Sequence, residues 1–375
     1  MGKDNEMLWV NYHGLFGSPM SWAQVNREMV LALDRLGCRV TVMAYRGFGY
    51  DPEFPLEERI RSLRTGQRSQ EWDVAFEYPL NYDRLQARRK AGLLVYETTE
   101  LPPHWARAIR EHLDLLVVPS SLCVRAAERS GIPPDRILRI PYACDPSRFS
   151  PRPKATSKSN PLEDRFTFLC LAMPHLRKGL RELVQSFREE FDPDESVQLI
   201  LKMPYSSVPR RRKPWELENV QALVPPEEAV PSGRSISLVC RSEPPDRIPS
   251  WLARCDAYVQ PSYGEGFGLA ILEAKAVGRP TLVTGWGGHM DFCTAANSYL
   301  VDYEMIPAGE AQYDNGSGSA RCARPLIPSL RAQMRRVFQN REEAREKVER
   351  SIGDVRPFTW ERSAKQLQEA LRARM

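Results

Sequence analysis

The stretch Tyr258–Phe292, YVQPSYGEGFGLAILEAKAVGRPTLVTGWGGHMDF, constrains the fold of this chain more than any other. Its pattern predicts a strand over Ala257–Gln260, a glycine turn, a helix over Leu269–Val277 closed by Gly278, and a strand over Pro280–Val283. A second glycine turn follows at Gly285, Gly287 and Gly288. Two glycine turns thus follow neighbouring strands, each feeding a helix, at the edge where open α/β sheets bind ligands.

The first glycine turn has the chemistry of a phosphate site. Glycines let the backbone approach a ligand, and amides at a helix start favour an anion. Glu265 precedes the predicted helix, and Glu273 lies inside it, where a carboxylate is costly unless it is paired. Sugar hydroxyls would be suitable partners, so the pattern describes a nucleotide sugar. The backbone residues expected to bind it are Gly266, Phe267, Gly268 and Leu269.

The same residues resemble a known family. The segment PSYGEGFGLAILEA, with its two glutamates eight residues apart, resembles the signature of family 4 retaining glycosyltransferases (glycosyl transferases group 1). The resemblance implies the GT-B fold: two Rossmann-like α/β domains with parallel sheets facing a cleft, and a C-terminal helix crossing back to the first domain. It also implies that Glu265 holds sugar hydroxyls and Glu273 the ribose. A generic α/β turn with a solvated Glu265 is the alternative.

The length of 375 residues suits two domains, each with its own core. The segment PRPKATSKSNPLED has the composition of a linker, and Asp145, Phe149 and Pro151 resemble the hinge of the family. We therefore predict an acceptor-side domain over 1–152, a nucleotide-sugar-binding domain over 153–357, and a helix over 358–375 that packs back on the first domain.

Composition narrows the partners and the compartment. The net charge of +5 permits an anionic substrate or a peripheral membrane contact but demands neither. Eight scattered cysteines show no metal or disulfide spacing, so we expect a cytoplasmic protein, at most peripheral to the inner face of the membrane. No apolar run reaches the length of a membrane span. The basic run Arg210–Lys213 lacks interleaved aromatics, which favours a solvated loop over nucleic-acid binding.

The first half reads as a βαβ series. Strands are predicted over 8–12, 40–44, 74–76, 93–96 and 115–118, alternating with helices over 22–36, 82–90, 103–112 and 120–130. Ser18 is the predicted N-cap of the first helix. The resemblance implies that the loop after the first strand approaches the donor or acceptor. For His13 itself, an ordinary histidine at the end of a strand is an equal alternative. The glycines of that loop named as binding residues are Gly14 and Gly17.

Two charged features of the first half have open interpretations. Glu97 follows a predicted strand and would orient an acceptor hydroxyl or cap the next helix. Some family members carry a histidine near this point, and this chain does not. A basic cluster is interpreted as a solvated helix face or, alternatively, as a contact for anionic lipid. Its members are Arg84, Arg88, Arg89 and Lys90.

The second half adds a cation pair. A strand over 166–172 leads into a loop with Arg177 and Lys178, beside a predicted helix start, where two cations indicate an anionic partner. By resemblance they clamp the donor diphosphate, with Arg177 replacing an arginine that the family places where Met173 stands. A surface pair of cations on a helix start is the alternative. Lys202, on a predicted strand over 197–203, is a further candidate. Other expected elements are a strand over 236–239, helices over 249–253 and 330–348, a polar loop over 315–319, and a last helix after Thr359.

These features together predict transfer of a sugar from a UDP- or GDP-sugar to a carbohydrate or glycolipid acceptor, with retention and with no metal or other cofactor. Lys178, Arg177 and Glu265 are the expected catalytic residues. A glycoside hydrolase also uses two carboxylates, but they must flank one bond. An epimerase or phosphorylase on the same fold would share the clamp. A non-catalytic nucleotide-sugar or carbohydrate-binding protein is the alternative from a different class.

Overall fold

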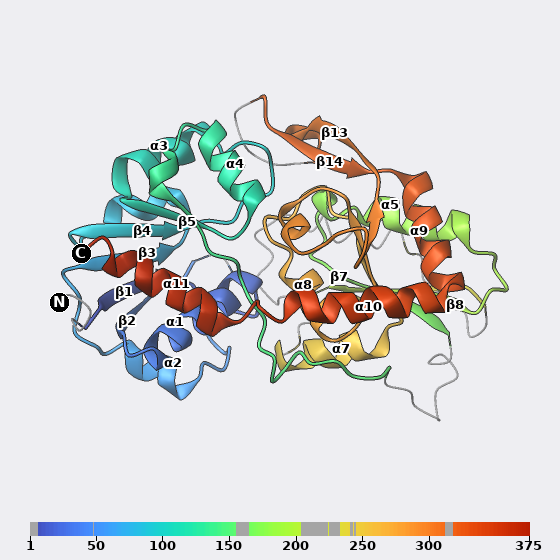
Figure 1. The fold of residues 1–375 in the computed structure, drawn as a ribbon, viewed down its shortest axis with the longest axis horizontal. Helices are drawn as coiled ribbons and strands as arrows, with labels where there is room; N and C mark the ends of the chain where they lie inside the picture. The colour runs from blue at the N-terminus through green and yellow to red at the C-terminus, as the bar shows by residue number, and fades with distance from the viewer. Residues whose placement is uncertain are drawn as a thin grey trace. The chain divides into compact units, whose positions relative to one another are not determined.

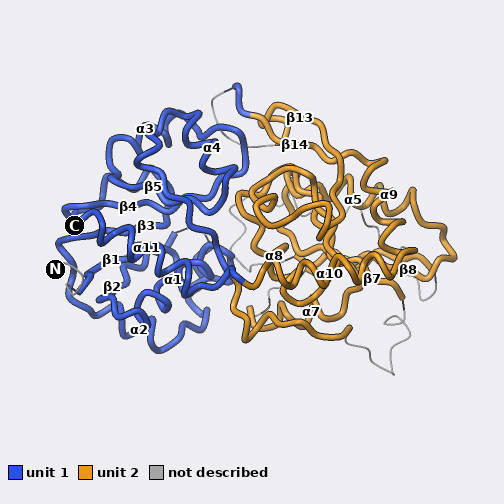
Figure 2. Tube along the Cα trace, viewed as in Figure 1, with its two compact units in different colours: residues 1–143, 315–320, 357–375 blue, residues 144–314, 321–356 orange. Residues whose placement is uncertain are grey.

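The computed structural model, drawn in Figure 1, describes residues 7–47, 49–154, 165–203, 224, 233–240, 243, 245–311 and 318–375. The basic run Arg210–Lys213, most of the linker and most of the predicted loop 315–319 lie outside the described residues. The chain divides into two compact units (Figure 2). Unit 1 comprises 1–143, 315–320 and 357–375, and unit 2 comprises 144–314 and 321–356.

The first division between the units falls after Ala143, earlier than the boundary near 152 that the sequence indicates. The segment 144–152 groups with unit 2 because its end is bonded to residues that directly follow the helix α8 (Leu269–Ala276). The Arg152 amide donates to Val277 O at 3.3 Å, and the Arg279 guanidinium donates to Arg152 O at 2.6 Å.

Unit 1 is built on a parallel sheet with the order β2-β1-β3-β4-β5-β6. Its strands are β1 (Trp9–Gly14), β2 (Arg39–Ala44), β3 (Trp72–Phe76), β4 (Arg89–Leu93), β5 (Leu115–Val118) and β6 (Ile137–Arg139). Its helices are α1 (Ser21–Arg35), α2 (Glu58–Leu63), α3 (Pro103–His112), α4 (Ser121–Arg129) and α11 (Trp360–Arg372), with 3₁₀ turns η1 (Pro79–Arg84) and η2 (Pro134–Arg136). The strand order reverses between β1 and β3, which is a topological switch point.

Three predictions about unit 1 are wrong. Ser18 does not cap α1: the helix begins at Ser21 after Met20, and the Ser18 hydroxyl accepts from the Met20 amide at 3.2 Å. The helix predicted over 82–90 is absent, since these residues finish η1 and enter β4, which pairs with β3 from Arg89 onward. For the same reason the strand expected over 93–96 ends at Leu93.

The last helix of the chain completes unit 1. Thr359 is its N-cap, as predicted, and its side chain accepts from the Arg362 amide at 3.3 Å. The helix α11 lies against α1 (Figure 1). Gln368 donates to Leu36 O, and Ser363 donates to Pro141 O, so polar bonds join the helix to the N-terminal segment of the unit.

Unit 2 is built on a second parallel sheet with the order β12-β11-β10-β7-β8-β9. Its strands are β7 (Phe166–Leu171), β8 (Val197–Met203), β9 (Ser235–Cys240), β10 (Ala257–Gln260), β11 (Thr281–Thr284) and β12 (Tyr299–Val301). A two-stranded antiparallel sheet follows, formed by β13 (Tyr303–Pro307) and β14 (Arg321–Pro325). The strand order across this sheet is that of a dinucleotide-binding Rossmann fold, and the switch point lies between β7 and β10.

The helices of unit 2 are α5 (Leu180–Glu190), α7 (Ile248–Arg254), α8 (Leu269–Ala276), α9 (Ile327–Gln339) and α10 (Arg341–Val355). The single helix predicted over 330–348 is wrong, because Asn340 interrupts it and caps α10 by accepting from the Glu343 amide at 3.0 Å. α5 packs against α9, and α8 packs against α10. Apolar side chains of the strands and of α5 and α9 form the core between them, with Phe166, Phe168, Phe187 and Phe191 in ring contact.

Candidate functional site at the switch point of unit 2

The site is formed by the two loops that leave β7 and β10. These strands are neighbours, and the chain runs from β7 to β8 on one side and from β10 to β11 on the other. Their loops therefore part at the carboxyl edge of the sheet, where ligands bind in such folds. The loop after β7 contains the turn η4 (Leu176–Lys178), and the loop after β10 contains Glu265.

Glu265 is the centre of this site. Its Oε1 accepts from Lys178 Nζ at 2.5 Å, from Gln260 Nε2 at 2.5 Å and from Ser262 Oγ at 2.7 Å. Gln260 is bonded in turn to the Tyr258 hydroxyl. Lys178 and Glu265 are both buried, so the ion pair lies away from bulk water. The structure therefore brings together two of the three residues expected to be catalytic, and adds Gln260 and Ser262, which the sequence did not single out.

Electrostatics keep the Glu265 carboxyl ionised. Burial alone would raise its pKa, but the charges of Lys178 and Arg177 and the hydrogen bonds from Lys178 and Ser262 outweigh burial and lower the pKa to about 2. Burial, together with Arg177 and Lys178, lowers the pKa of His175 to about 4. The site thus combines the negative charge of Glu265 with the two cations Arg177 and Lys178, and the neighbouring His175 is neutral at pH 7.

Backbone contacts hold the two loops against each other. Gly179 has φ 65°, and a Cβ there would lie 2.0 Å from Pro261 O, so only glycine allows this approach. The Tyr263 amide donates to Arg177 O at 2.7 Å, and this hydrogen bond is a second backbone contact between the same two loops. The position of Lys178 relative to Glu265 is therefore set by backbone geometry as well as by the ion pair.

The second glycine turn supports the first. The Gly288 amide donates to Glu265 O at 2.6 Å, and the Thr284 hydroxyl donates to Ser262 O at 2.7 Å. His289 is fully buried beside this turn, with Nε2 2.8 Å from Thr284 O. Burial lowers its pKa, so the imidazole is neutral and Nε2 carries the donated proton. The turn feeds only a 3₁₀ helix, η7 (Gly288–Asp291), rather than the α-helix that the pattern suggests.

The helix α8 places the remaining predicted donor-site residues. Gly268, at φ 90°, is the N-cap residue of the helix and precedes its first residue Leu269. Phe267 is buried, and its ring packs on Phe292 with 5.2 Å between centroids. Glu273 is buried on α8, and its charge adds to burial in raising the pKa of the Cys144 thiol to about 12.

Lys202 lies at the end of β8, next to β7 in the sheet. It is 4% exposed, donates to Met203 O at 3.3 Å, and stands over the Trp251 ring of α7. Met173, in the loop after β7, is 40% exposed.

The predicted residues of unit 1 gather at its own switch point. His13 is the penultimate residue of β1, and its Nε2 lies 3.1 Å from Oδ1 of Asp73, a buried residue of β3. Gly14 and Gly17 are packed by protein: a Cβ at Gly14 would lie 2.4 Å from the Asn26 side chain, and one at Gly17 would lie 3.1 Å from a neighbouring tyrosine ring.

The acidic and basic predictions of unit 1 have different outcomes in the structure. Glu97 is half-buried beyond the end of β4, close enough to raise the pKa of Tyr142. The basic cluster does not share one helix face, because Arg84 ends η1 whereas Arg89 and Lys90 begin β4. A solvated helix face over these residues is therefore wrong.

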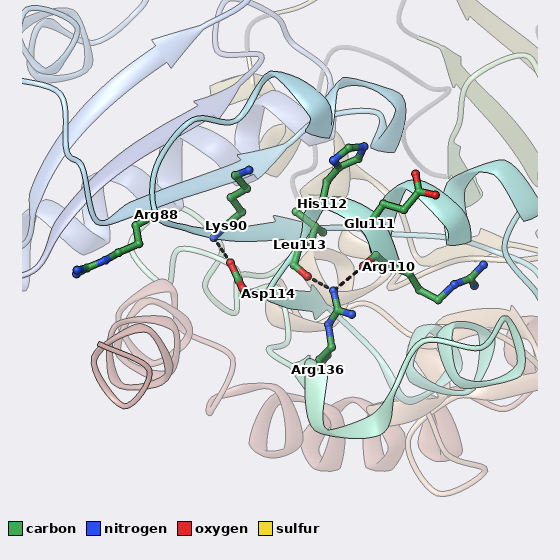
Figure 3. A pocket seen from close by; sticks show the side chains of 8 residues that line it. All are labelled: Arg88, Lys90, Arg110, Glu111, His112, Leu113, Asp114 and Arg136. Atoms are coloured by element: carbon green, nitrogen blue, oxygen red, sulfur yellow. Dashed lines mark hydrogen bonds between the residues drawn. The ribbon is translucent and has the colours of Figure 1, made fainter.

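A shallow pocket on unit 1 takes in part of this basic cluster (Figure 3). It lies where β4 and β5 begin, at the amino edge of the sheet rather than at the ligand-binding edge. Arg136 donates to Leu113 O and to Arg110 O at the end of α3, which are carbonyls without helical partners. The pocket lining comprises Arg88, Lys90, Arg110, Glu111, His112, Leu113, Asp114 and Arg136.

The described ranges contain no group of three or more His, Cys, Asp or Glu side chains arranged to hold a metal ion. Metal independence itself stays a prediction. All eight cysteines lie within the described residues and carry free thiols. None of the helices in the described part of the chain has the length and apolar character needed to span a membrane.

Comparisons with known proteins agree with this architecture. Residues 165–311 match the model of the family described as Glycosyl transferases group 1. The D-inositol 3-phosphate glycosyltransferase of Pseudarthrobacter chlorophenolicus is 26% identical over 209 residues, which cover 53% of this chain and 47% of that relative. The chain thus spans about half the length of that curated relative.

Solved structures extend the likeness to the whole fold. A sucrose-phosphate synthase from Thermosynechococcus elongatus has a TM-score of 0.72 at 16% identity, with 98% of each chain covered. HepE from Anabaena, in complex with UDP and glucose, has a TM-score of 0.71 at 12% identity and covers 98% of this chain and 100% of its own. The chain therefore has the GT-B fold, and its segment 165–311 matches the family model of the glycosyl transferases group 1.

Proposed function

We propose that this protein is a glycosyltransferase that moves a sugar from a nucleotide-sugar donor to an acceptor hydroxyl. The observation that carries the proposal is the buried Lys178–Glu265 pair at the switch point of unit 2, with Glu265 three residues before Gly268, the N-cap residue of α8. A helix start and two cations suit a diphosphate, and a carboxylate fixed in its ionised form suits sugar hydroxyls. The donor site therefore lies within the segment that matches the family.

The chemistry asked of this site is stabilisation of a departing diphosphate. Negative charge grows on the phosphate oxygens as the bond to the sugar breaks, and preorganised donors aimed there carry most of the catalysis. In our proposal, Lys178 and Arg177 supply the positive charge that stabilises the departing diphosphate, and Glu265 orients the sugar. Glu273, buried on α8, holds the ribose. We further propose that the anomeric configuration is retained and that no metal takes part.

The proposed donor is a UDP- or GDP-sugar, and UDP-glucose is the first candidate because HepE has been solved with it. The proposed acceptor is a carbohydrate or glycolipid. In support, the curated relative is named a D-inositol 3-phosphate glycosyltransferase, and another neighbour is a trehalose-phosphate synthase from Burkholderia vietnamiensis, with a TM-score of 0.69. A role in polysaccharide or glycoconjugate synthesis is part of the same proposal.

Calorimetry tests the donor site directly. UDP, GDP and ADP, each with its glucose conjugate, are titrated into the wild type, Lys178→Ala and Glu273→Ala. We expect one nucleotide to bind and both substitutions to weaken it by about tenfold or more, since a hydrogen bond to a charged group contributes about 1.5–3 kcal/mol. Arg181→Ala is the matched control, because this exposed cation lies three residues from Lys178 on α5. Binding that ignores both substitutions refutes the assignment.

Product analysis tests the remaining parts of the proposal. NMR of the product formed from UDP-glucose shows whether the anomeric configuration is kept, and EDTA shows whether a metal is required. Met173 supports a second candidate: where the family carries a phosphate-binding arginine, this chain exposes a thioether. A non-catalytic nucleotide-sugar-binding protein would bind the donor with the same dependence on Lys178 but release no free nucleotide.

A further inference from the structure

An aromatic surface lies at the carboxyl edge of the sheet in unit 1. Tyr78 follows the end of β3, Trp22 is the second residue of α1, and Trp105 is the third residue of α3. All three positions lie where strands of a parallel sheet end and the following helices begin, so they share the ligand-binding edge. Tyr78 is 40% exposed, and both tryptophans are half-buried.

The rings are in mutual contact and form one continuous surface. Tyr78 meets Trp22 edge-on at 5.5 Å between centroids and meets Trp105 edge-on at 5.7 Å. Buried rings support both sides: Trp22 packs on Phe76 at 6.1 Å, and Trp105 packs on Tyr96 at 5.3 Å. The surface is therefore held in place before any ligand arrives, which reduces the entropic cost of binding.

Polar groups border this aromatic surface. Glu77 directly precedes Tyr78 in the chain, and burial together with the charges of Glu77 and Tyr78 raises the pKa of the Tyr45 hydroxyl to about 12. Glu77 is also near His13, whose charge opposes the effect of burial on the Glu77 pKa. The half-buried side chains of Glu77, His13 and Tyr45 thus belong to the same end of the sheet as the exposed ring of Tyr78, each following or lying near the end of one of the adjoining strands β1, β2 and β3.

Exposed aromatic rings with convergent polar groups are features of a ligand site rather than of ordinary surface. A pyranose ring presents C–H bonds on its faces and hydroxyls on its rim, so it can stack on an aromatic ring while its hydroxyls reach a carboxylate. An acyl chain would gain nothing from Glu77 or His13, and desolvating them would be costly. The combination of groups therefore favours a sugar.

We propose that Trp22, Tyr78 and Trp105 bind a sugar ring of the acceptor, with Glu77 receiving hydrogen bonds from its hydroxyls. The inference rests on the proposed function, because it names the chemical class of the acceptor for the same reaction. It makes the acceptor a glycan or a glycoconjugate whose sugar is recognised through its apolar face.

Substitutions at Tyr78 test the proposal, because this exposed ring can be removed with little effect on folding. The probes are maltotriose, cellotriose and isomaltotriose, followed by saturation-transfer NMR and by quenching of tryptophan fluorescence. We expect at least one trisaccharide to bind, Tyr78→Ala to weaken it about fivefold, and Tyr78→Phe to keep it within about twofold, because a stacked ring contributes about 0.5–1.5 kcal/mol. Tyr303→Ala, which removes an exposed tyrosine of unit 2, is the matched control.

Two further measurements separate this proposal from its alternatives. Nucleotide binding by calorimetry tests the proposed donor site of unit 2. A wild type that binds none of UDP, GDP and ADP would refute the proposed function, whereas unchanged trisaccharide binding in Tyr78→Ala would refute the aromatic site. Sedimentation with vesicles of equal parts phosphatidylcholine and phosphatidylglycerol tests a membrane contact through the neighbouring Leu80, which is 57% exposed. Vesicle binding that Leu80→Ser and Tyr78→Ala abolish, with no trisaccharide bound, would overturn the sugar site.

Discussion

Replacing Lys178 by methionine keeps most of the side-chain volume but removes the cation that touches the Glu265 carboxylate at 2.5 Å. Breaking a buried ion pair from one side leaves the other charge uncompensated, which costs about 3–5 kcal/mol. The pKa of Glu265 gives an independent figure. Its value falls from 4.5 to about 2 on folding, and a tenfold change in proton affinity corresponds to about 1.4 kcal/mol, so ionised Glu265 contributes about 3 kcal/mol at neutral pH.

The sign of the pH dependence follows from the same numbers. Because the folded-state pKa of Glu265 is depressed, its contribution is fully present above about pH 4.5 and is lost as the pH falls toward 2. At about pH 3 the contribution has fallen to about 1.4 kcal/mol. In Lys178→Met the buried carboxyl binds its proton more readily, so the difference in unfolding free energy between wild type and variant is expected to shrink in acid.

Urea unfolding monitored by tryptophan fluorescence, at neutral pH and at about pH 3, measures these differences. The double variant Lys178→Met with Glu265→Gln removes both charges, and we expect it to recover most of the lost stability at neutral pH, because no charge is left buried. It should not recover nucleotide binding. The reasoning is refuted if Lys178→Met costs less than about 1 kcal/mol, or if the double variant is less stable than the single one.

Three further predictions concern the backbone and the unit 1 network. Gly179→Ala should destabilise the protein by about 2 kcal/mol or more and weaken nucleotide binding, because the left-handed φ is strained for alanine and the new Cβ would meet Pro261 O. Gly309→Ala is the control: this glycine has open space around it, so the change in unfolding free energy should stay within about 0.5 kcal/mol in the same urea assay. Thr359→Ala should cost about 1 kcal/mol through the lost cap of α11, and amide exchange in the first turn of that helix should quicken; unchanged exchange would contradict the cap. Asp73→Asn should cost about 1–3 kcal/mol at neutral pH and less in acid, since its carboxylate accepts from two backbone amides and its pKa lies well below the usual range; equal losses at both pH values would argue against an ionised Asp73.

The sequence predicts best the elements whose pattern is local and strong. Strands over 115–118, 197–203 and 257–260 and the helix over 103–112 have the predicted bounds, since each is a short apolar run or an amphipathic stretch with clear punctuation. The GT-B fold and the family resemblance are confirmed, because the glycine turn and the two glutamates form a contiguous motif.

The errors arise where tertiary contacts decide. The residues 82–90 have the charge pattern of a helix, but Arg89 onward pairs with β3, a partner that no local pattern reveals. The break at Asn340 was readable, because Asn followed by Glu at the third position is a capping signal within an otherwise continuous helical pattern. The hairpin of β13 and β14 was missed, since both strands have only five residues and neither shows a clear apolar alternation.

The candidate site was predictable in part. Glu265 and Lys178 were named as separate motifs, but their 2.5 Å contact depends on the approach of Gly179 to Pro261, which is a long-range feature. Gln260 ends a predicted strand five residues before Glu265, so the sequence already indicates that its side chain lies at the same edge of the sheet as Glu265. Asp73 as the partner of His13 had none, because the pairing of β1 with β3 brings them together across 60 residues.

The division of the chain has a consequence for its synthesis. Unit 1 takes its residues from three separate stretches, and α11, the last of them, is made after all of unit 2. A ribosome therefore releases the first sheet with the surface that α11 covers still open, including α1 and the region of Leu36 and Pro141. The N-terminal unit of this protein, although translated first, can be completed only once α11 has been made.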